Sequence, residues 1–116
     1  CMTILSTHIL DTTLGLPASN VQVSLYQLQN EMPQLLSQGI TDESGRIKQF
    51  ELPSDNRALA IGEYQLVFAT AEYFAKNKRA CFYPKVTIDF VLDGTQAHCH
   101  VPLLISSYGF STYRGS

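Results

Sequence analysis

The sequence predicts an antiparallel β-sandwich with one short helix, formed by a single domain over residues 1–116. Short segments of strand-like composition recur about every ten residues, with Gly, Pro, Asp and Asn between them, which indicates seven or eight strands. Only one segment has helical composition, and nothing alternates strands with long helices as a parallel sheet requires. A chain of 116 residues is long enough for one hydrophobic core and too short for two domains.

The first strand is predicted over residues 4–10, which carry apolar residues on both faces. Such a pattern indicates burial on two sides, either inside a sandwich or at a subunit interface. Residues 11–17 contain Gly and Pro and are expected to form a loop. Residues 21–26 alternate between apolar and polar side chains, as a half-buried strand does.

The middle of the chain predicts two weaker strands around a turn. Residues 35–41 form the first of them. Residues 41–46 combine Asp, Ser and Gly, each of which favours a turn for local backbone reasons. Residues 47–50 then predict a short edge strand. After a loop, residues 63–69 alternate again and predict a further half-buried strand.

A change of period marks the helix, which is predicted near residues 71–77. Thr70 is suited to the N-cap position and Glu72 lies in the first turn, where a carboxylate is favoured. Pro84 then breaks the chain ahead of the clearest strand, over residues 85–92. Another strand is predicted over residues 97–105, and a terminal strand follows the turn at Tyr108 and Gly109.

Composition and charge exclude several functional classes. The net charge is −2 and no basic block is present, which argues against nucleic-acid binding through phosphate neutralisation. The apolar runs are shorter than the roughly 18 residues of a membrane span, so no membrane partner is expected. Three cysteines without a C-x-x-C pair do not indicate a disulfide framework. We therefore expect a cytoplasmic protein that starts at Met2, with Cys1 as an added residue; a periplasmic protein after signal cleavage is the alternative.

Two histidines lie close together near the C-terminus. His98 and His100 are two residues apart on a predicted strand, so their side chains share one face at a spacing of roughly 7 Å. Pro102 and Leu104 share this face, which indicates a partly apolar pocket. Cys99 points to the opposite side and is expected to be a small buried hydrophobic residue.

His8 and two arginines complete the set of candidate functional residues. Arg46 follows the predicted turn and offers a planar donor fork for carbonyl oxygens or an anionic group, although a solvated surface arginine is the alternative. Arg114 lies within the terminal residues 113–116 (YRGS). Each histidine taken singly is more often structural than catalytic. Neither a G-x-S-x-G motif nor a glycine-rich phosphate loop is present.

A zinc site with three histidines is a competing interpretation, because three imidazoles and an open position suit catalytic zinc. The spacing does not exclude such a site. No Asp or Glu adjoins the histidines in sequence to support them as metal ligands. A metal-free site is therefore the favoured hypothesis.

Several motifs together carry a resemblance to a known family. They are residues 5–11 (LSTHILD), 41–47 (Thr-x-x-x-Gly-Arg-Ile), 82–86 (FYPKV), 98–104 (His-x-His-Val-Pro-Leu-Leu) and 111–116 (STYRGS). Over essentially the whole chain they resemble the transthyretin-like family, and within it the purine-catabolic branch of 5-hydroxyisourate hydrolases. The terminal YRGS is the most specific signature. The hormone-carrying transthyretins share the fold but lack this ending and the histidine pattern.

The resemblance implies a sandwich of two four-stranded sheets and a homotetramer built as a dimer of dimers. In such a tetramer the terminal strands pair edge to edge between subunits, and the active sites lie at the dimer–dimer interface. The catalytic positions that it implies are His8, Arg46, His100 and Ser116. The substrate-binding positions that it implies are His8, Arg46, His98, Tyr113, Arg114 and Gly115. It implies no metal and no cofactor.

The activity that the resemblance implies is hydrolysis of 5-hydroxyisourate to 2-oxo-4-hydroxy-4-carboxy-5-ureidoimidazoline, by addition of water across the N1–C6 amide. His8 and His100 would flank the attacked carbon, one handling water and the other the leaving nitrogen, and histidine suits this role at neutral pH. Arg46 would stabilise the oxyanion, Tyr113 would position the ring, and the Ser116 hydroxyl or carboxylate would orient water or a histidine. The alternatives are a transthyretin-type carrier of an apolar ligand and a structural sandwich without chemistry.

Overall fold

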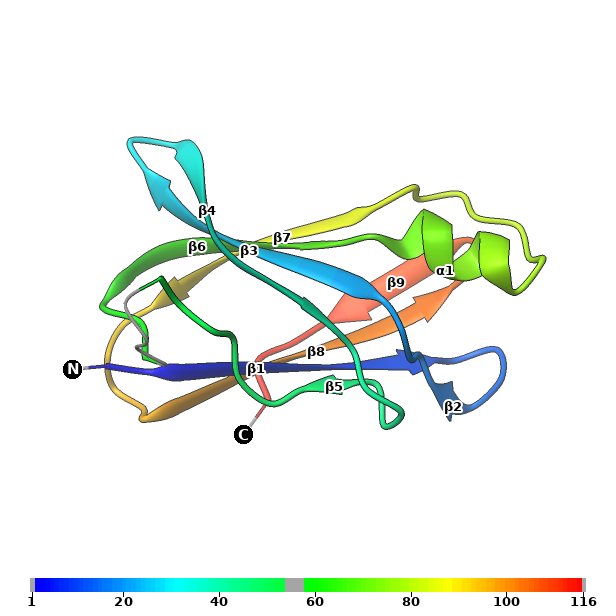
Figure 1. Cartoon of the computed structure of the whole chain (residues 1–116), viewed down its shortest axis with the longest axis horizontal. Coiled ribbons are helices and arrows are strands. Elements are labelled where there is room, and N and C mark those ends of the chain that lie inside the picture. Colours follow the sequence, from blue (N-terminus) through cyan, green and yellow to red (C-terminus); the bar gives the residue numbers. More distant parts are fainter. Residues whose placement is uncertain (1, 54–57, 116) are drawn as a thin grey trace.

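Figure 1 shows a computed structural model of the chain, which describes residues 2–53 and 58–115. Cys1 and the predicted catalytic residue Ser116 lie outside the described residues. The elements are β1 (Ile4–Asp11), β2 (Leu16–Pro17), β3 (Gln22–Gln29), β4 (Met32–Ile40), β5 (Arg46–Ile47), β6 (Gly62–Phe68), α1 (Thr70–Lys76), β7 (Val86–Leu92), β8 (His98–Ser106) and β9 (Gly109–Thr112). No helix in this described part of the chain is both long and apolar enough to span a membrane.

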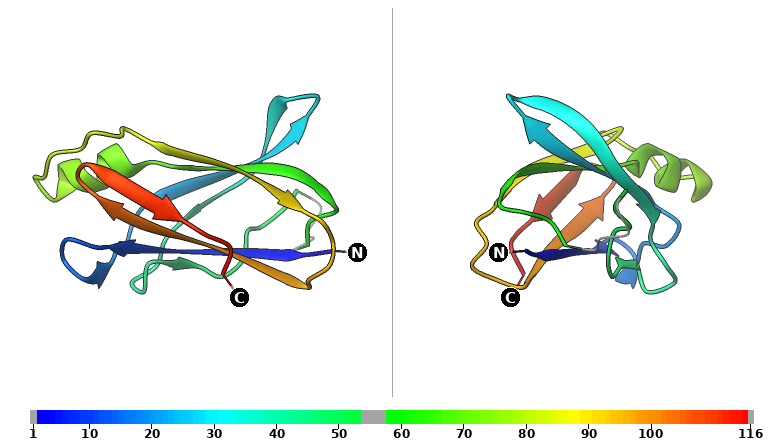
Figure 2. Two further views of the ribbon diagram at one scale, coloured as in Figure 1. Left: turned by 180° about the vertical axis from the view of Figure 1, so that it is seen from behind. Right: turned by 60° about the vertical axis from the view of Figure 1, so that its left-hand side comes forward.

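The strands form two sheets that face each other as layers of a sandwich, which confirms the predicted fold class (Figure 2). One sheet has four strands in the order β4-β3-β6-β7. The other has five strands rather than the predicted four, because β2 and β5, of two residues each, both pair with β1. This second sheet is also not wholly antiparallel: β1 and β8 run parallel along their whole paired length.

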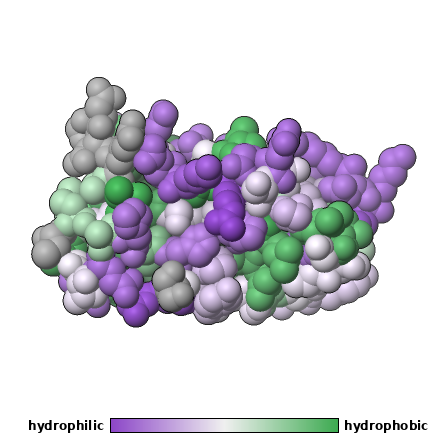
Figure 3. Space-filling view, turned by 90° about the horizontal axis from the view of Figure 1, so that it is seen from below, coloured by the Kyte–Doolittle hydropathy of each residue, from purple (hydrophilic) through white to green (hydrophobic). Residues whose placement is uncertain are grey.

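The two faces of β1 differ in burial, in strict alternation along the strand. Leu5, Ile9 and the other side chains of the inner face are buried, whereas the outer face of the strand, with Ser6 and His8, is half-buried within one chain. The sequence predicted burial on both faces of this strand. Within a single chain, only the inner face confirms that prediction. The five-stranded sheet is the lower layer in Figure 1, and Figure 3 views it from below: hydrophilic side chains occupy the middle and hydrophobic ones lie to either side.

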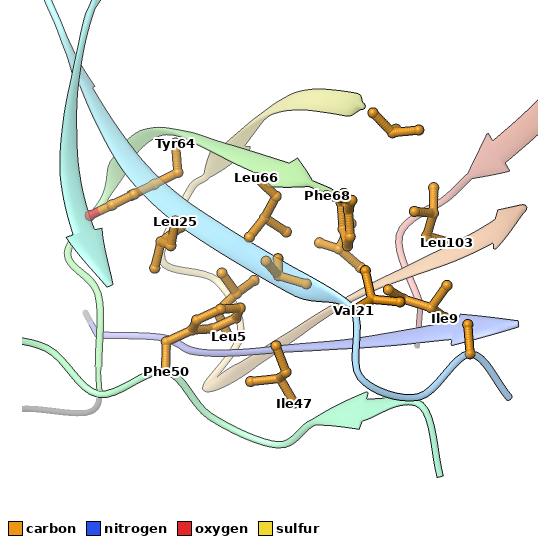
Figure 4. Close-up of a cluster of buried hydrophobic side chains, with 14 of the residues drawn as sticks. Leu5, Ile9, Val21, Leu25, Ile47, Phe50, Tyr64, Leu66, Phe68 and Leu103 are labelled. Carbon is orange, nitrogen blue, oxygen red and sulfur yellow. The ribbon is translucent and has the colours of Figure 1, made fainter. Parts of the chain in front are cut away.

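The hydrophobic core fills the space between the two sheets (Figure 4). The side chains drawn there include Leu25, Leu66 and Phe68 from the four-stranded sheet and Ile9 and Leu103 from the other, each at most 1% exposed. Burying one such side chain contributes about 1.5–3 kcal/mol to folding. The predicted alternation of β3 and β6 places these residues inward, and Cys99 also lies on the inner side, at 6% exposure.

Three local predictions differ from the structure. Thr70 is the first residue of α1 and not its N-cap, which is Ala69, because the Thr70 hydroxyl is buried and donates instead to the carbonyl oxygen of Tyr83 at 3.0 Å. The edge strand predicted over residues 47–50 is limited to Arg46–Ile47, since Phe50 turns into the core. The predicted loop over residues 11–17 contains Asp11, the last residue of β1, and the two-residue strand β2. The terminal strand, for which no end was predicted, ends at Thr112, and residues 113–115 continue without strand structure apart from one bridge at Gly115.

Candidate active site

The outer face of the five-stranded sheet brings together residues from both ends of the chain. β1 and β8 lie side by side in parallel register, with Ser6 opposite His100 and His8 opposite Pro102. The rings of His8 and His100 are 6.5 Å apart between centroids and are tilted by 32°. These two histidines are therefore close enough to act on one small molecule bound between them.

Arg46 reaches the same face through the turn that precedes it. In the pairing of β1 with β5, His8 lies opposite Arg46. The turn is closed by the Asp42 carboxylate, which accepts backbone hydrogen bonds from Ser44 at 2.8 Å and from Arg46 at 3.0 Å. Because the hydrogen bond from Arg46, the largest effect, and that from Ser44 stabilise the carboxylate, the pKa of Asp42 is lowered.

Gly45 is required in this turn for two reasons. Its φ of +74° lies in the left-handed region, and an added Cβ would stand 2.6 Å from the carbonyl oxygen of Ile9. The close approach also allows the Ile9 amide to donate to the Gly45 carbonyl oxygen at 2.8 Å. The turn is thereby held against β1, and this contact places Arg46 beside His8.

The electrostatic environment keeps both histidines neutral near neutral pH. Burial, followed by the Arg46 charge, lowers the pKa of His8, while a hydrogen bond to the backbone of Ser44 and the Asp42 charge oppose this shift. The pKa of His100 is lowered for related reasons, first by burial and then by the charges of Arg46 and His8. A neutral imidazole has one N–H donor and one free lone pair. The pair can therefore both accept and donate a proton.

His100 has two further neighbours in the chain. Its Nδ1 is hydrogen-bonded to the Ser6 hydroxyl at 2.8 Å, and its carbonyl oxygen accepts from the Gly115 amide at 2.8 Å. Ser6 belongs to residues 5–11, yet sequence reasoning assigned it no role. Only the parallel pairing of β1 with β8 places it opposite His100, and nothing in the sequence indicates that pairing.

The structure places the predicted site residues His98, Tyr113 and Arg114 in three different surroundings. His98 is exposed at the start of β8, opposite Ile4, on the same face as His100. Tyr113 is 59% exposed. Arg114 does not join the histidines within one chain: it borders a small cleft with Asp93 and Cys99, on the side of β8 away from His100. Among residues 2–53 and 58–115, no group of three or more His, Cys, Asp or Glu is arranged to hold a metal ion.

A larger cavity lies away from these residues. It has a volume of about 400 Å³ and lies over the four-stranded sheet, where β6 and β7 meet the hairpin of β3 and β4. Carboxylates and apolar side chains line it, among them Glu63, Asp89 and Val91. Among the described residues, neither histidine nor arginine lines this cavity, so these residues supply neither a base suited to neutral pH nor a cation that could stabilise an oxyanion.

Comparison with known proteins shows the family and the fold of the chain. The chain is 44% identical over 113 residues to a 5-hydroxyisourate hydrolase from Salmonella dublin, covering 97% of this chain and 81% of that protein. A 5-hydroxyisourate hydrolase structure from Klebsiella pneumoniae superposes with a TM-score of 0.84 at 39% identity, over 98% of this chain and 100% of that one. Sea bream transthyretin shares the fold, with a TM-score of 0.86 at 23% identity over 96% and 93% of the two chains. The profile of the HIUase/Transthyretin family matches residues 5–115, and the chain belongs to that family.

Proposed function

We propose that this chain is a 5-hydroxyisourate hydrolase of purine catabolism, which opens the six-membered ring of its substrate by adding water across a cyclic amide. The observation that carries the proposal is the pair of neutral histidines beside Arg46 on one face of the sheet. Relatives named 5-hydroxyisourate hydrolase match almost the whole chain. A carrier of apolar ligands is less well supported, because imidazoles and a guanidinium suit a small polar heterocycle.

In the proposed mechanism His8 activates the attacking water. The Ser44 backbone raises the pKa of His8, so in this mechanism the ring nitrogen that faces Ser44 holds the proton. The other nitrogen then carries a free lone pair. It takes a proton from water while the water oxygen bonds to the amide carbon C6, and it returns that proton to N1 as the C6–N1 bond breaks.

Arg46 and His100 stabilise the oxyanion that forms on the carbonyl oxygen of C6. Arg46 carries a permanent charge and lies opposite His8 in the strand pairing. His100, which is neutral, donates the N–H of Nε2 to the same oxygen. Fixed donors aimed at developing charge are often the largest contribution to catalysis of this kind. Tyr113 and Gly115 belong to the terminal segment that borders the substrate in this mechanism.

The direct test is an ultraviolet assay of freshly generated 5-hydroxyisourate. The purified chain is expected to accelerate its decay well above the spontaneous rate, which a sample without protein measures in parallel. Decay at the spontaneous rate would overturn the proposed function. Loss of turnover after metal chelation, with stoichiometric zinc in the purified protein, would favour the zinc hydrolase instead.

We also propose the homotetramer, with active sites at the dimer–dimer interface. A second subunit would cover the half-buried outer face of β1 and turn the open histidine pair into an enclosed site. β7 and β9 are edge strands of their sheets in the described chain and could pair with their copies in another subunit. Light scattering after gel filtration should give four times the chain mass; a monomeric mass with full activity would contradict this proposal. The cytoplasmic location stays a prediction.

Removing residues 113–116 should abolish turnover while the protein stays folded. These residues follow β9, and the described ones contribute no buried core side chain, so the sandwich does not depend on them. Loss of the Gly115 amide would free the backbone of His100. The measurement is turnover together with thermal unfolding of the truncated and full-length chains. Full activity of the truncated chain would exclude a role for the terminus.

The pH dependence of kcat/KM follows from the lowered pKa of His8. Water activation needs the neutral ring, so activity should be constant above the usual value of 6.5 and fall only in more acidic solution. Stability has the same sign: below 6.5 the unfolded chain binds a proton before the folded chain does, so acidification costs stability there. Rates and unfolding should be followed from about pH 5 to about pH 8. A midpoint of activity above 6.5 would contradict this assignment.

A further inference from the structure

The imidazole of His100 is held between two groups from opposite ends of the chain. On the Nδ1 side, the Ser6 hydroxyl lies 2.8 Å from the ring nitrogen. On the Cδ2 side, the backbone of Gly115 lies so close that an added Cβ would stand 2.9 Å from Cδ2. The ring therefore has a hydrogen bond on one edge and a main-chain wall on the other, and only its Nε2 end remains for a ligand.

Space, and not backbone conformation, requires a glycine at position 115. A Cβ there would also meet the Cβ of His100 at 3.2 Å and its carbonyl oxygen at 3.3 Å. Real Cβ atoms essentially never lie as close as 2.9 Å to a neighbour, so a larger residue would displace the ring or the terminal segment. The bridge from the Gly115 amide to the His100 carbonyl oxygen, at 2.8 Å, keeps this wall in place.

The direction of the hydrogen bond between Ser6 and His100 determines which nitrogen of His100 carries the proton. A hydroxyl can donate or accept, but the lone pair of a neutral imidazole is a better acceptor than a hydroxyl oxygen. With Ser6 as the donor to Nδ1, the ring proton lies on Nε2. In this tautomer the free end of His100 is a hydrogen-bond donor. His8, whose pKa the Ser44 backbone raises, is the ring to which the proposed mechanism gives the free lone pair.

We propose that Ser6 is a positioning residue for catalysis, which acts with Gly115 to hold His100 in one orientation and in the tautomer protonated on Nε2. The catalytic consequence rests on the proposed hydrolase function, whereas the tautomer itself does not. Ser6 lies on the half-buried outer face of β1 and takes no part in the core. Its loss should therefore change His100 without unfolding the chain.

The test combines nitrogen-15 NMR of the imidazole rings with steady-state kinetics. The chain has three histidines, and the His100 signals are assigned by their loss in His100→Asn. At about pH 8, where the ring is neutral, the wild-type protein should show Nε2–H for His100. Ser6→Ala should give a mixture of tautomers and lower kcat about tenfold, with KM almost unchanged, as expected for loss of a histidine's hydrogen-bond partner.

Two conservative variants separate positioning from a general effect on structure. Ser6→Thr keeps the hydroxyl and should retain both the tautomer and kcat within about threefold. Ser24→Ala is the matched control, because Ser24 is also a half-buried strand serine, and its hydroxyl accepts a hydrogen bond from the exposed Gln38 amide in the other sheet. It should change neither measurement. Gly115→Ala should shift the His100 signals and lower kcat even though the Ser6 hydroxyl is present.

Unchanged His100 signals in Ser6→Ala would overturn the inference, whatever happens to the rate. Protonation of Nδ1 in the wild-type protein would overturn it as well. If the wild-type signals show Nε2–H, and Ser6→Ala loses this preference, but the chain does not accelerate the decay of 5-hydroxyisourate, the proposed function fails and the positioning of His100 by Ser6 stands.

Discussion

Replacing His8 by Asn should lower kcat by about 100-fold or more, which is the contribution typical of a general base. Asn keeps a polar side chain on the half-buried outer face of β1 but cannot accept the water proton near neutral pH. The free energy of unfolding should therefore change little. Turnover of 5-hydroxyisourate and urea unfolding measure the two effects, with Ser24→Ala as the control away from the histidines.

His100→Asn should also lower kcat by about 100-fold, because it removes the proposed oxyanion donor. The two histidines act on one transition state, so the double variant should lose much less than the product of the two single effects. Multiplicative losses would show that the histidines act independently. Activity within about tenfold of the wild type in His8→Asn would exclude His8 as the general base.

Replacing Asp11 by Ala should lower the free energy of unfolding by about 3–5 kcal/mol, the usual cost of removing one partner of a buried ion pair. The Asp11 side chain is fully buried and forms an ion pair with Arg79, which donates from both terminal nitrogens of its guanidinium. The Tyr73 hydroxyl donates to the same carboxylate at 2.7 Å. These contacts join the end of β1 to α1 and to the segment that follows the helix.

The variant would leave the Arg79 guanidinium, only 18% exposed, without its counter-charge. Urea unfolding measures the loss, and Asp89→Asn is the control, because Asp89 is exposed and its carboxylate accepts a hydrogen bond from Gln65, on the outer face of β6, at 2.9 Å. The control should stay within about 0.5 kcal/mol of the wild type. A loss below about 1 kcal/mol in Asp11→Ala would show that the attraction within the ion pair barely exceeds the cost of removing its charges from water.

The lowered pKa of the Asp11 carboxyl group predicts how the stability of the fold responds to acid. Burial, the largest effect, would raise the pKa of Asp11, but hydrogen bonds from Arg79, Tyr73 and the Leu14 amide outweigh it, and the pKa is lowered from 3.8. The folded state therefore binds this proton less readily than the unfolded state. The resulting stability is complete well above 3.8 and is lost as the pH falls through the lowered value.

Local patterns along the chain were sufficient to predict most elements. Alternation of apolar and polar residues identified β3 and β6, because side chains on a strand point to opposite faces with a period of two, and strand-like composition identified β7 and β8. The same period correctly placed Cys99 inward and His98 and His100 on the outer face. The helix was located by its composition, within one residue at each end.

Pairing between distant segments could not be read in this way. The parallel contact of β1 with β8 joins residues more than 90 positions apart, and no local signal encodes it. Thr70 was predicted to be the N-cap from its residue type, but its hydroxyl donates a hydrogen bond to the carbonyl oxygen of Tyr83 instead. Arg114 was grouped with the histidines because it lies in the YRGS ending, whereas the path of the chain after β9 takes it towards Asp93.

The sequence by itself determined the fold class, the family resemblance and the residue types of a histidine–arginine site, because all three depend on local periodicity and short motifs. Tertiary structure alone decided that His8 and His100 lie 6.5 Å apart and that Ser6 contacts Nδ1. It also decided that the Gly115 backbone closes the other edge of the ring. These contacts depend on which strands become neighbours and in which register, and that choice is made by burial of the whole core.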